Sequence, residues 1–257
     1  MPDANGKHPQ GPSLRSLLAC QGAAVIASAA ATFAVIVGFY AAACVSGAPS
    51  GNCILAALAA GTIWTAVASP IMSAGAAGAL ASAMRLAAVV DTAGVSLLVI
   101  WLCGRVGIGG GVGFVAAVKI YCVWAVMALA GFAAVFLARS AAGRYAIGVA
   151  AGLVGLLAAA SPFWTNGIVE HVDAQTRQAV VTAAVQCNPF YAVMASVVDQ
   201  TRLVWHQAPV LYDITRIGQY NAPAPAMWHP FVIRCGALAL FLAACAVIRR
   251  RLIEKRD

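Results

Sequence analysis

Between Arg15 and Arg85 the chain runs for 69 residues without an aspartate, glutamate, lysine or arginine. The stretch is interrupted only at residues 46–52, a turn-forming patch with two glycines, a proline and an asparagine. A spanning helix needs about 20 apolar residues to cross a hydrocarbon core about 30 Å thick. An uncharged run of this length with a central break therefore predicts two membrane-spanning helices joined by a short hairpin.

The rest of the chain continues this pattern. Of the 257 residues, 62% are apolar and only 9% are charged, whereas a soluble domain carries about a quarter charged residues. We therefore expect an all-α polytopic membrane protein with six transmembrane helices. The expected spans are residues 17–45, 53–80, 86–103, 112–138, 145–164 and 231–248. The third is short, and Asp91 lies near its start.

The spans divide the chain into five parts. We expect a cytoplasmic tail at 1–16, helices one to five at 17–164, and an extracytoplasmic helical segment at 165–228. The sixth helix then occupies 229–248, and a basic cytoplasmic tail occupies 249–257. The first apolar run is too long for a signal-peptide core of about 7 to 15 residues, so it is expected to remain as an anchor.

Lysine and arginine predict the orientation, because cytoplasmic loops and tails of membrane proteins are enriched in both. With six spans, only Arg105 falls in the short loops of one side, and the other side receives ten basic residues. These are Lys7, Arg15, Arg85, Arg139, Arg144, Arg249, Arg250, Arg251, Lys255 and Arg256. We expect a bacterial inner-membrane protein with both termini in the cytoplasm. A five-span arrangement would instead separate the basic tail from the N-terminus.

The net charge of +8 does not indicate nucleic-acid binding. The basic residues sit mostly singly at the ends of apolar runs, whereas a nucleic-acid surface gathers them on one face with stacking aromatics. The lipid bilayer is the expected partner of this composition, and no nucleic acid is expected.

Residues 165–228 form the one long polar segment. Asp173 with Arg177 is spaced i,i+4, and the pairs at 199 and 202 and at 213 and 216 are spaced i,i+3, as on exposed faces of short helices. Asn188 followed by Pro189 predicts a helix start, because Asn caps free amides and Pro has no N–H to lose. The apolar face that follows is expected to lie in the outer headgroup layer or across the mouth of the bundle, with Asn188 and Pro189 as candidate gating residues.

Besides Arg234, near the outer end of the last expected span, two charged residues fall inside expected spans, Asp91 and Lys119. Intramembrane charges are costly and are often functional when they face a cavity, so both are candidates for gating or for the transport pathway. The alternative is that each side chain reaches the nearer interface.

The other reactive residues predict little chemistry. The four histidines fall in tails or in the polar segment and lack an H-E-x-x-H spacing, and the eight cysteines lack C-x-x-C spacing, so no metal site is expected. Cys44 and Cys53 flank the first hairpin and either form a disulfide or pack as free thiols. No phosphate-binding loop is present, and no paired reactive groups predict an intramembrane enzyme. Neither catalytic residues nor a cofactor in this chain is expected.

Several segments resemble the permease subunit of type-two ABC exporters. They are the glycine turn 109–112 before the fourth span, the stretch 128–132 leading to 137–140, residues 188–191 before the last span, and the basic tail 249–251. The resemblance implies a transport subunit without its own ATPase site, working with a second permease copy or homologue. A separate ABC ATPase subunit would bind the ATP.

The resemblance also implies where an ATPase would dock. Family members place a charged coupling element between spans two and three, but here residues 81–86 contain a single charge, Arg85. Arg85, Arg139 and Arg144 are therefore the inner-loop residues expected to contact an ATPase. The alternative is a non-transporting accessory or structural subunit of a larger membrane complex.

Overall fold

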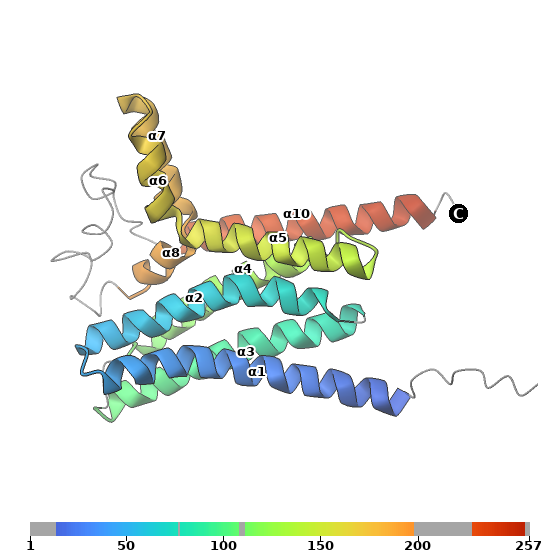
Figure 1. Cartoon of the computed structure of the whole chain (residues 1–257), viewed down its shortest axis with the longest axis horizontal. Helices are drawn as coiled ribbons and strands as arrows, with labels where there is room; N and C mark the ends of the chain where they lie inside the picture. The colour runs from blue at the N-terminus through green and yellow to red at the C-terminus, as the bar shows by residue number, and fades with distance from the viewer. Residues whose placement is uncertain (1–13, 77, 108–110, 198–227, 255–257) are drawn as a thin grey trace, which may run out of the picture.

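The computed structural model describes residues 14–76, 78–107, 111–197 and 228–254. Every regular element within these ranges is an α-helix (Figure 1). Six helices are long and apolar enough to cross a membrane, which confirms the number of spans predicted. They are α1 (Leu14–Val45), α2 (Ser50–Ala74), α3 (Ala79–Arg105), α4 (Phe114–Val135), α5 (Ala141–Ala159) and α10 (His229–Glu254).

The predicted hairpin between the first two spans is confirmed. α1 ends at Val45, and Gly47 has a φ of 74°, a left-handed conformation that favours glycine. The amide of Ala48 donates to the carbonyl of Ala43 at 3.2 Å, and α2 begins at Ser50. The turn patch therefore reverses the chain within four residues.

Several spans have bounds that differ from those predicted: α2 ends at Ala74 instead of about residue 80, and α10 extends to Glu254 instead of residue 248. α3 begins at Ala79 instead of residue 86, because the polar side chains of its first turns find partners in the bundle. Ser82 Oγ, for example, donates to the carbonyl of Ser73 at 2.9 Å. α5 ends at Ala159 instead of residue 164, and a second helix begins at Ser161. Pro162 in that new first turn has no N–H to continue the hydrogen-bond ladder of α5.

The centre of the bundle is occupied by α2, which packs against α1, α3, α4 and α5. Large side chains such as Leu58 and Trp124 are fully buried there. Gly61 of α2 gives the indole of Trp124 its space, since a Cβ at Gly61 would lie 2.5 Å from a ring carbon. The indole N–H donates to Thr62 Oγ1 at 3.0 Å. The interior of this single chain is therefore filled by packed side chains.

α5 lies against α2 through three glycines, Gly148, Gly152 and Gly155. A Cβ at any of them would lie between 2.8 and 3.2 Å from a backbone carbonyl oxygen of α2. Such small residues let two membrane helices approach backbone to backbone. The glycine and alanine richness of these spans therefore has a structural use at this contact.

The described residues between α5 and α10 form three short helices: α6 (Ser161–Val169), α7 (Ala174–Cys187) and α8 (Pro189–Ala195). α6 and α7 form a hairpin that projects across the axis of the bundle (Figure 1). A small core of Val169, Val181, Val185 and Tyr191 holds this hairpin to α8. Ala192, Val193 and Met194 of α8 join the main core, so the described part of the predicted apolar face packs onto the bundle.

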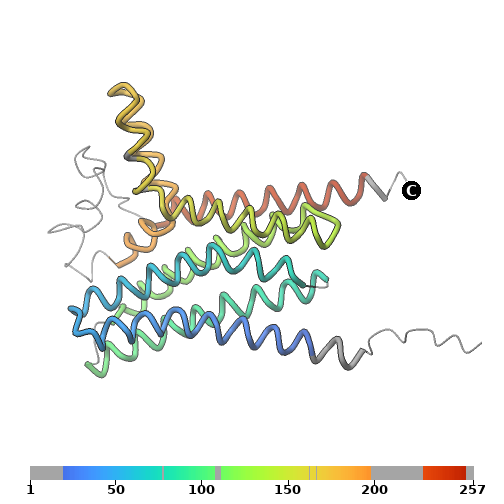
Figure 2. The backbone as a smooth tube through the Cα atoms, in the orientation of Figure 1, coloured from blue at the N-terminus to red at the C-terminus, as the bar shows by residue number. Residues whose placement is uncertain are grey.

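The first residues of α1 and the last residues of α10 lie at the same end of the bundle (Figures 1 and 2). Arg85, Arg139, Arg144, Arg249 and Arg250 come from elements that meet at this end, which we call the basic end. The α6–α7 hairpin lies at the opposite end. The distribution of arginine between the two ends agrees with the charge pattern used to predict the topology.

Candidate functional site

Asp91 lies close to the middle of α3. Twelve residues separate it from Ala79 and fourteen from Arg105, which correspond to about 18 and 21 Å along the helix. The expectation that Asp91 lies near one end of its span is therefore wrong. It rested on a helix start at residue 86, and the earlier start at Ala79 moves the carboxylate to mid-depth.

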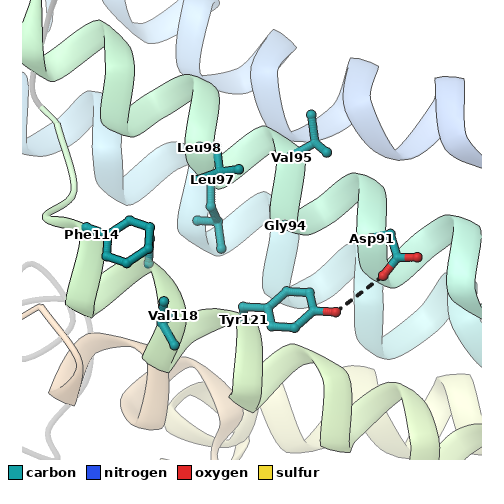
Figure 3. A pocket seen from close by; sticks show the side chains of 9 residues that line it. Asp91, Gly94, Val95, Leu97, Leu98, Phe114, Val118 and Tyr121 are labelled. Carbon is teal, nitrogen blue, oxygen red and sulfur yellow. Dashed lines mark hydrogen bonds between the residues drawn. The ribbon is translucent and has the colours of Figure 1, made fainter.

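The Asp91 side chain is exposed on the outer face of the bundle. It lies at one end of a groove between α3 and α4 with a volume of about 280 Å³ (Figure 3). The Tyr121 hydroxyl of α4 donates to Asp91 Oδ1 at 3.3 Å. The groove is lined by Asp91, Gly94, Val95, Leu97, Leu98, Phe114, Ala117, Val118 and Tyr121. A single carboxylate with one neutral donor thus sits among apolar side chains.

The position of Tyr121 depends on Gly94, which lies one turn from Asp91 on α3. A Cβ at Gly94 would lie 3.0 Å from two ring carbons of Tyr121. The ring therefore rests on α3 where no side chain stands, and its hydroxyl reaches the carboxylate (Figure 3). Tyr121 could not be identified from the sequence, because the order of residues does not show which side chains of α3 and α4 face each other.

Asp91 is the only acidic residue in the six candidate spans. A carboxylate at the bilayer centre costs about 2.5 to 3.5 kcal/mol on an insertion scale, and such residues usually face a bundle interior or a water-filled cavity. Here the carboxylate faces outward from the chain. The arrangement is suited to binding a cation or a hydrogen-bond donor supplied from outside this bundle.

Lys119 is not brought together with Asp91. It is half-buried and lies five residues from the start of α4, about 8 Å along the helix. Residues two apart on a helix point in widely different directions, so Lys119 and Tyr121 occupy different faces of α4. This depth is within reach of the interface for a lysine side chain. A pathway role for Lys119 stays a prediction.

Arg85 lies within α3, not in a loop. Residues 81–86 are all helical, and the α2–α3 connection consists only of residues 75–78. The half-buried guanidinium donates to Gln21 Oε1 of α1 at 3.1 Å and to the carbonyl of Met72 in α2 at 3.4 Å. Arg85 therefore ties three helices together at the basic end. Its predicted contact with an ATPase remains untested.

Arg139 and Arg144 lie at the junction of α4 and α5. The structure places them in one cavity of about 290 Å³ together with Arg249 and Arg250 of α10. The expectation of a contact with an ATPase stays a prediction for this pair as well. Sequence analysis did not group the four arginines, since more than 100 residues separate the two pairs.

Asn188 begins α8, as predicted, and its side chain is buried. Its Oδ1 accepts from the amides of Phe190 and Tyr191 at 2.8 and 3.2 Å. Its Nδ2 donates at 3.0 Å to the carbonyl of Ala159 and to Ser161 Oγ. Asn188 thus joins the end of α5, the start of α6 and the start of α8. The buried Pro189 follows as the first residue of α8, and a gating role for the two residues stays a prediction.

Replacing Asn188 with alanine is expected to lower the free energy of unfolding by about 2 to 4 kcal/mol. Loss of a helix cap costs about 1 kcal/mol, and the buried groups left without a partner cost about 1 to 3 kcal/mol more. Asn188→Asp keeps the cap but loses both donated hydrogen bonds, so its stability should fall between alanine and wild type. Thermal unfolding of the purified chain in detergent measures all three. Equal melting of Asn188→Ala and wild type would contradict these contacts.

The spacing of Asp173 and Arg177 predicts a pair on an exposed helix face, whereas the structure gives Asp173 the role of a helix cap. It caps α7, accepting from the amides of Gln175 and Thr176 at 3.1 and 3.0 Å. Hydrogen bonds from Thr176, first of all from its side chain, hold the pKa of the Asp173 carboxyl below its ordinary value. The pairs at 199 and 202 and at 213 and 216 lie outside the described residues.

Cys44 and Cys53 are free thiols in the structure. The buried Cys53 Sγ donates to the carbonyl of Ala48 at 3.5 Å, which helps to close the first hairpin. Among the described residues, no group of three or more His, Cys, Asp or Glu is arranged to hold a metal ion.

The fold and the location of Asp91 define a class: a multi-pass helical membrane protein with one mid-depth carboxylate on its outer face. Comparison of the chain with protein-family models, with curated proteins and with solved structures finds no match.

Proposed function

We propose that the chain is the permease subunit of an ATP-driven exporter of the ABC type. In this proposal it forms the translocation path with a second copy or homologue, and a separate ATPase subunit binds ATP. The observation that carries the proposal is the location of Asp91 at mid-depth on an outward-facing groove. The ATP-driven class rests on the resemblance of the segments at 109–112, 128–140 and 188–191 to type-two exporters.

The packing of the bundle supports a path between chains. The interior around α2 is filled by side chains such as Leu58 and Trp124, so a solute has no route through one copy. A polar path along the α3–α4 face would surround the Asp91 carboxylate with water or with substrate. Such a path removes the cost of exposing a charge to lipid, which an isolated chain would carry.

The alternative is a non-transporting accessory subunit of a larger membrane complex. The observation that favours it is the short α2–α3 connection of residues 75–78, because type-two exporters dock their ATPase at this position. Arg85, the first charged residue after this connection, already donates to Gln21 and Met72 within the bundle. In this case Asp91 would bind a partner helix instead of lining a path.

Extraction of the full-length chain from its native membranes in a mild detergent distinguishes the two functions. We expect a soluble subunit with a phosphate-binding loop to co-purify and the complex to hydrolyse ATP. Mass spectrometry identifies the bound subunits, and phosphate release measures the hydrolysis. A stable complex that contains no nucleotide-binding subunit would refute the exporter and leave the accessory subunit.

A further inference from the structure

A cavity of about 290 Å³ opens at the basic end, between the α4–α5 connection and the last turns of α10. Arg139, Arg144, Arg249 and Arg250 line it, with Phe136 and Ala246 among its apolar neighbours. Two of these arginines follow α4 and two end α10, so the fold gathers four positive charges from distant parts of the chain. We call this cavity the arginine pocket.

Among the residues that the structure describes, no carboxylate lines the arginine pocket. Glu254, the last residue of α10, lies four residues beyond Arg250. The other carboxylates in the described ranges belong to Asp91, Glu170 and Asp173. Asp91 lies at mid-depth, and the other two lie near the α6–α7 turn at the opposite end (Figure 1). The first turn of α5 adds to the positive potential, because the N-terminal end of a helix dipole attracts anions.

Two of the four arginines are held in place by contacts with the bundle, and a third is partly buried in it. Arg249 donates to the carbonyl of Leu137, which the end of α4 leaves free. The Arg250 guanidinium stacks over the ring of Phe136 at 5.7 Å. Arg144 is half-buried, and its Nε is buried without a hydrogen-bond partner. A buried donor without a partner costs about 1 to 3 kcal/mol, so an acceptor that enters the pocket is favoured.

The pocket lies at the end of a candidate membrane span. The candidate span in α10 extends to Leu252, which puts Arg249 and Arg250 in its last turn. Apolar Ala246 and Phe136 continue from the arginines into the span. Basic pockets between membrane helices on the cytoplasmic side recognise anionic lipid headgroups. A lipid phosphate fits both the charged rim and the apolar floor, whereas a free anion would use only the rim.

We infer that the arginine pocket binds the phosphate of an anionic phospholipid. Arg139 and Arg144 contact the phosphate oxygens, and Arg250, stacked on Phe136, closes the opposite side. Guanidinium and phosphate form strong charge-assisted hydrogen bonds, often two to one group. This site does not depend on the transport function proposed above.

The test compares phospholipids that share acyl chains and differ in charge. The full-length chain, purified in a neutral detergent, is incubated with phosphatidylglycerol or phosphatidylcholine and repurified, and the bound lipid is quantified by mass spectrometry. We expect phosphatidylglycerol to be retained in preference to phosphatidylcholine. The double variant Arg139→Gln, Arg144→Gln should weaken phosphatidylglycerol binding roughly thirtyfold, because each arginine contributes about 1 kcal/mol to binding at a membrane surface.

The matched control removes the same charge at the opposite end. Arg105, which stacks over Trp101, and Arg234, which donates to Gln186, are both changed to Gln. This control should bind phosphatidylglycerol as the wild type does. Circular dichroism verifies that each variant is folded, and the comparison of the two lipids on the wild-type chain does not depend on any variant.

Four results would overturn the inference. The first is equal retention of the two lipids by the wild type, and the second is equal loss of binding in the control. The third is displacement of phosphatidylglycerol by a moderate excess of inorganic phosphate, which would assign the pocket to a free anion. If the Arg139→Gln and Arg144→Gln variant keeps its lipid but loses a nucleotide-binding subunit, the arginines dock a protein and the lipid site is refuted.

Discussion

Gly148→Val is expected to lower the free energy of unfolding by about 3 kcal/mol, the upper end of the usual cost of overpacking. A Cβ at Gly148 would lie 2.8 Å from both the carbonyl oxygen of Pro70 and the Cβ of Ala74. The Pro70 carbonyl belongs to the backbone of the central helix α2, so it has no rotamer by which to move away. The folded population relative to the unfolded one should fall roughly a hundredfold.

Gly38→Val is the matched control. Gly38 lies inside α1, is exposed, and has no atom within 4 Å of an added Cβ. Both variants carry the same change in helix propensity, so the difference between them isolates the contact of α5 with α2. Unfolding of the full-length chain in mixed micelles measures both. If the two variants unfold alike, the backbone contact at Gly148 is absent.

Position 91 is expected to be accessible to water in native membranes. In a cysteine-free background, Asp91→Cys should react with a membrane-impermeant thiol reagent far faster than Leu240→Cys. Leu240 is the matched control, because it is exposed near the middle of α10 and so lies at a similar depth. The reaction requires a thiolate, and a charge at the centre of lipid costs about 2.5 to 3.5 kcal/mol, so the rates should differ by roughly a hundredfold.

The second variant keeps the shape of the site. Asp91→Asn retains an acceptor for the Tyr121 hydroxyl and removes the negative charge, so helix packing should be unchanged while any binding of a cation at this position is lost. Equal labelling at positions 91 and 240 would place both in lipid. That result would refute a water-filled path along α3 and leave Asp91 as a contact for a partner helix.

The number of spans and the first hairpin could be read from the residues. Each span depends on a local property, a run of about 20 apolar residues, and the hairpin on the turn residues at 46–52. The ends of several spans could not be read. Arg85 ends an apolar run in the sequence, yet α3 continues through it because Gln21 and Met72 accept from its guanidinium. The error at α3 carried over to Asp91, whose depth follows from the start of the helix.

The candidate sites were visible only as isolated residues. Asp91 was chosen because a charge in a span is costly, but its partner Tyr121 lies 30 residues away on another helix. Asn188 was identified as a helix start, and its bonds to Ala159 and Ser161 depend on how α5 and α6 meet α8. Arg139 and Arg144 were assigned to a loop, with nothing to indicate that α10 brings Arg249 and Arg250 beside them.

Hydrophobic length and charge act on each segment separately, so the order of residues is enough to predict a six-span helical membrane protein with most of its arginines at one end. Three further features depend on how the helices pack: Asp91 faces outward beside Tyr121, α2 fills the centre, and four arginines share a pocket. These depend on which helices are neighbours and which face each one turns. Small residues such as Gly61, Gly94 and Gly148 decide which helices become neighbours and which faces meet, because they allow close contact. The sequence around each of them is apolar, as it is in every span, so it does not distinguish these glycines from the others.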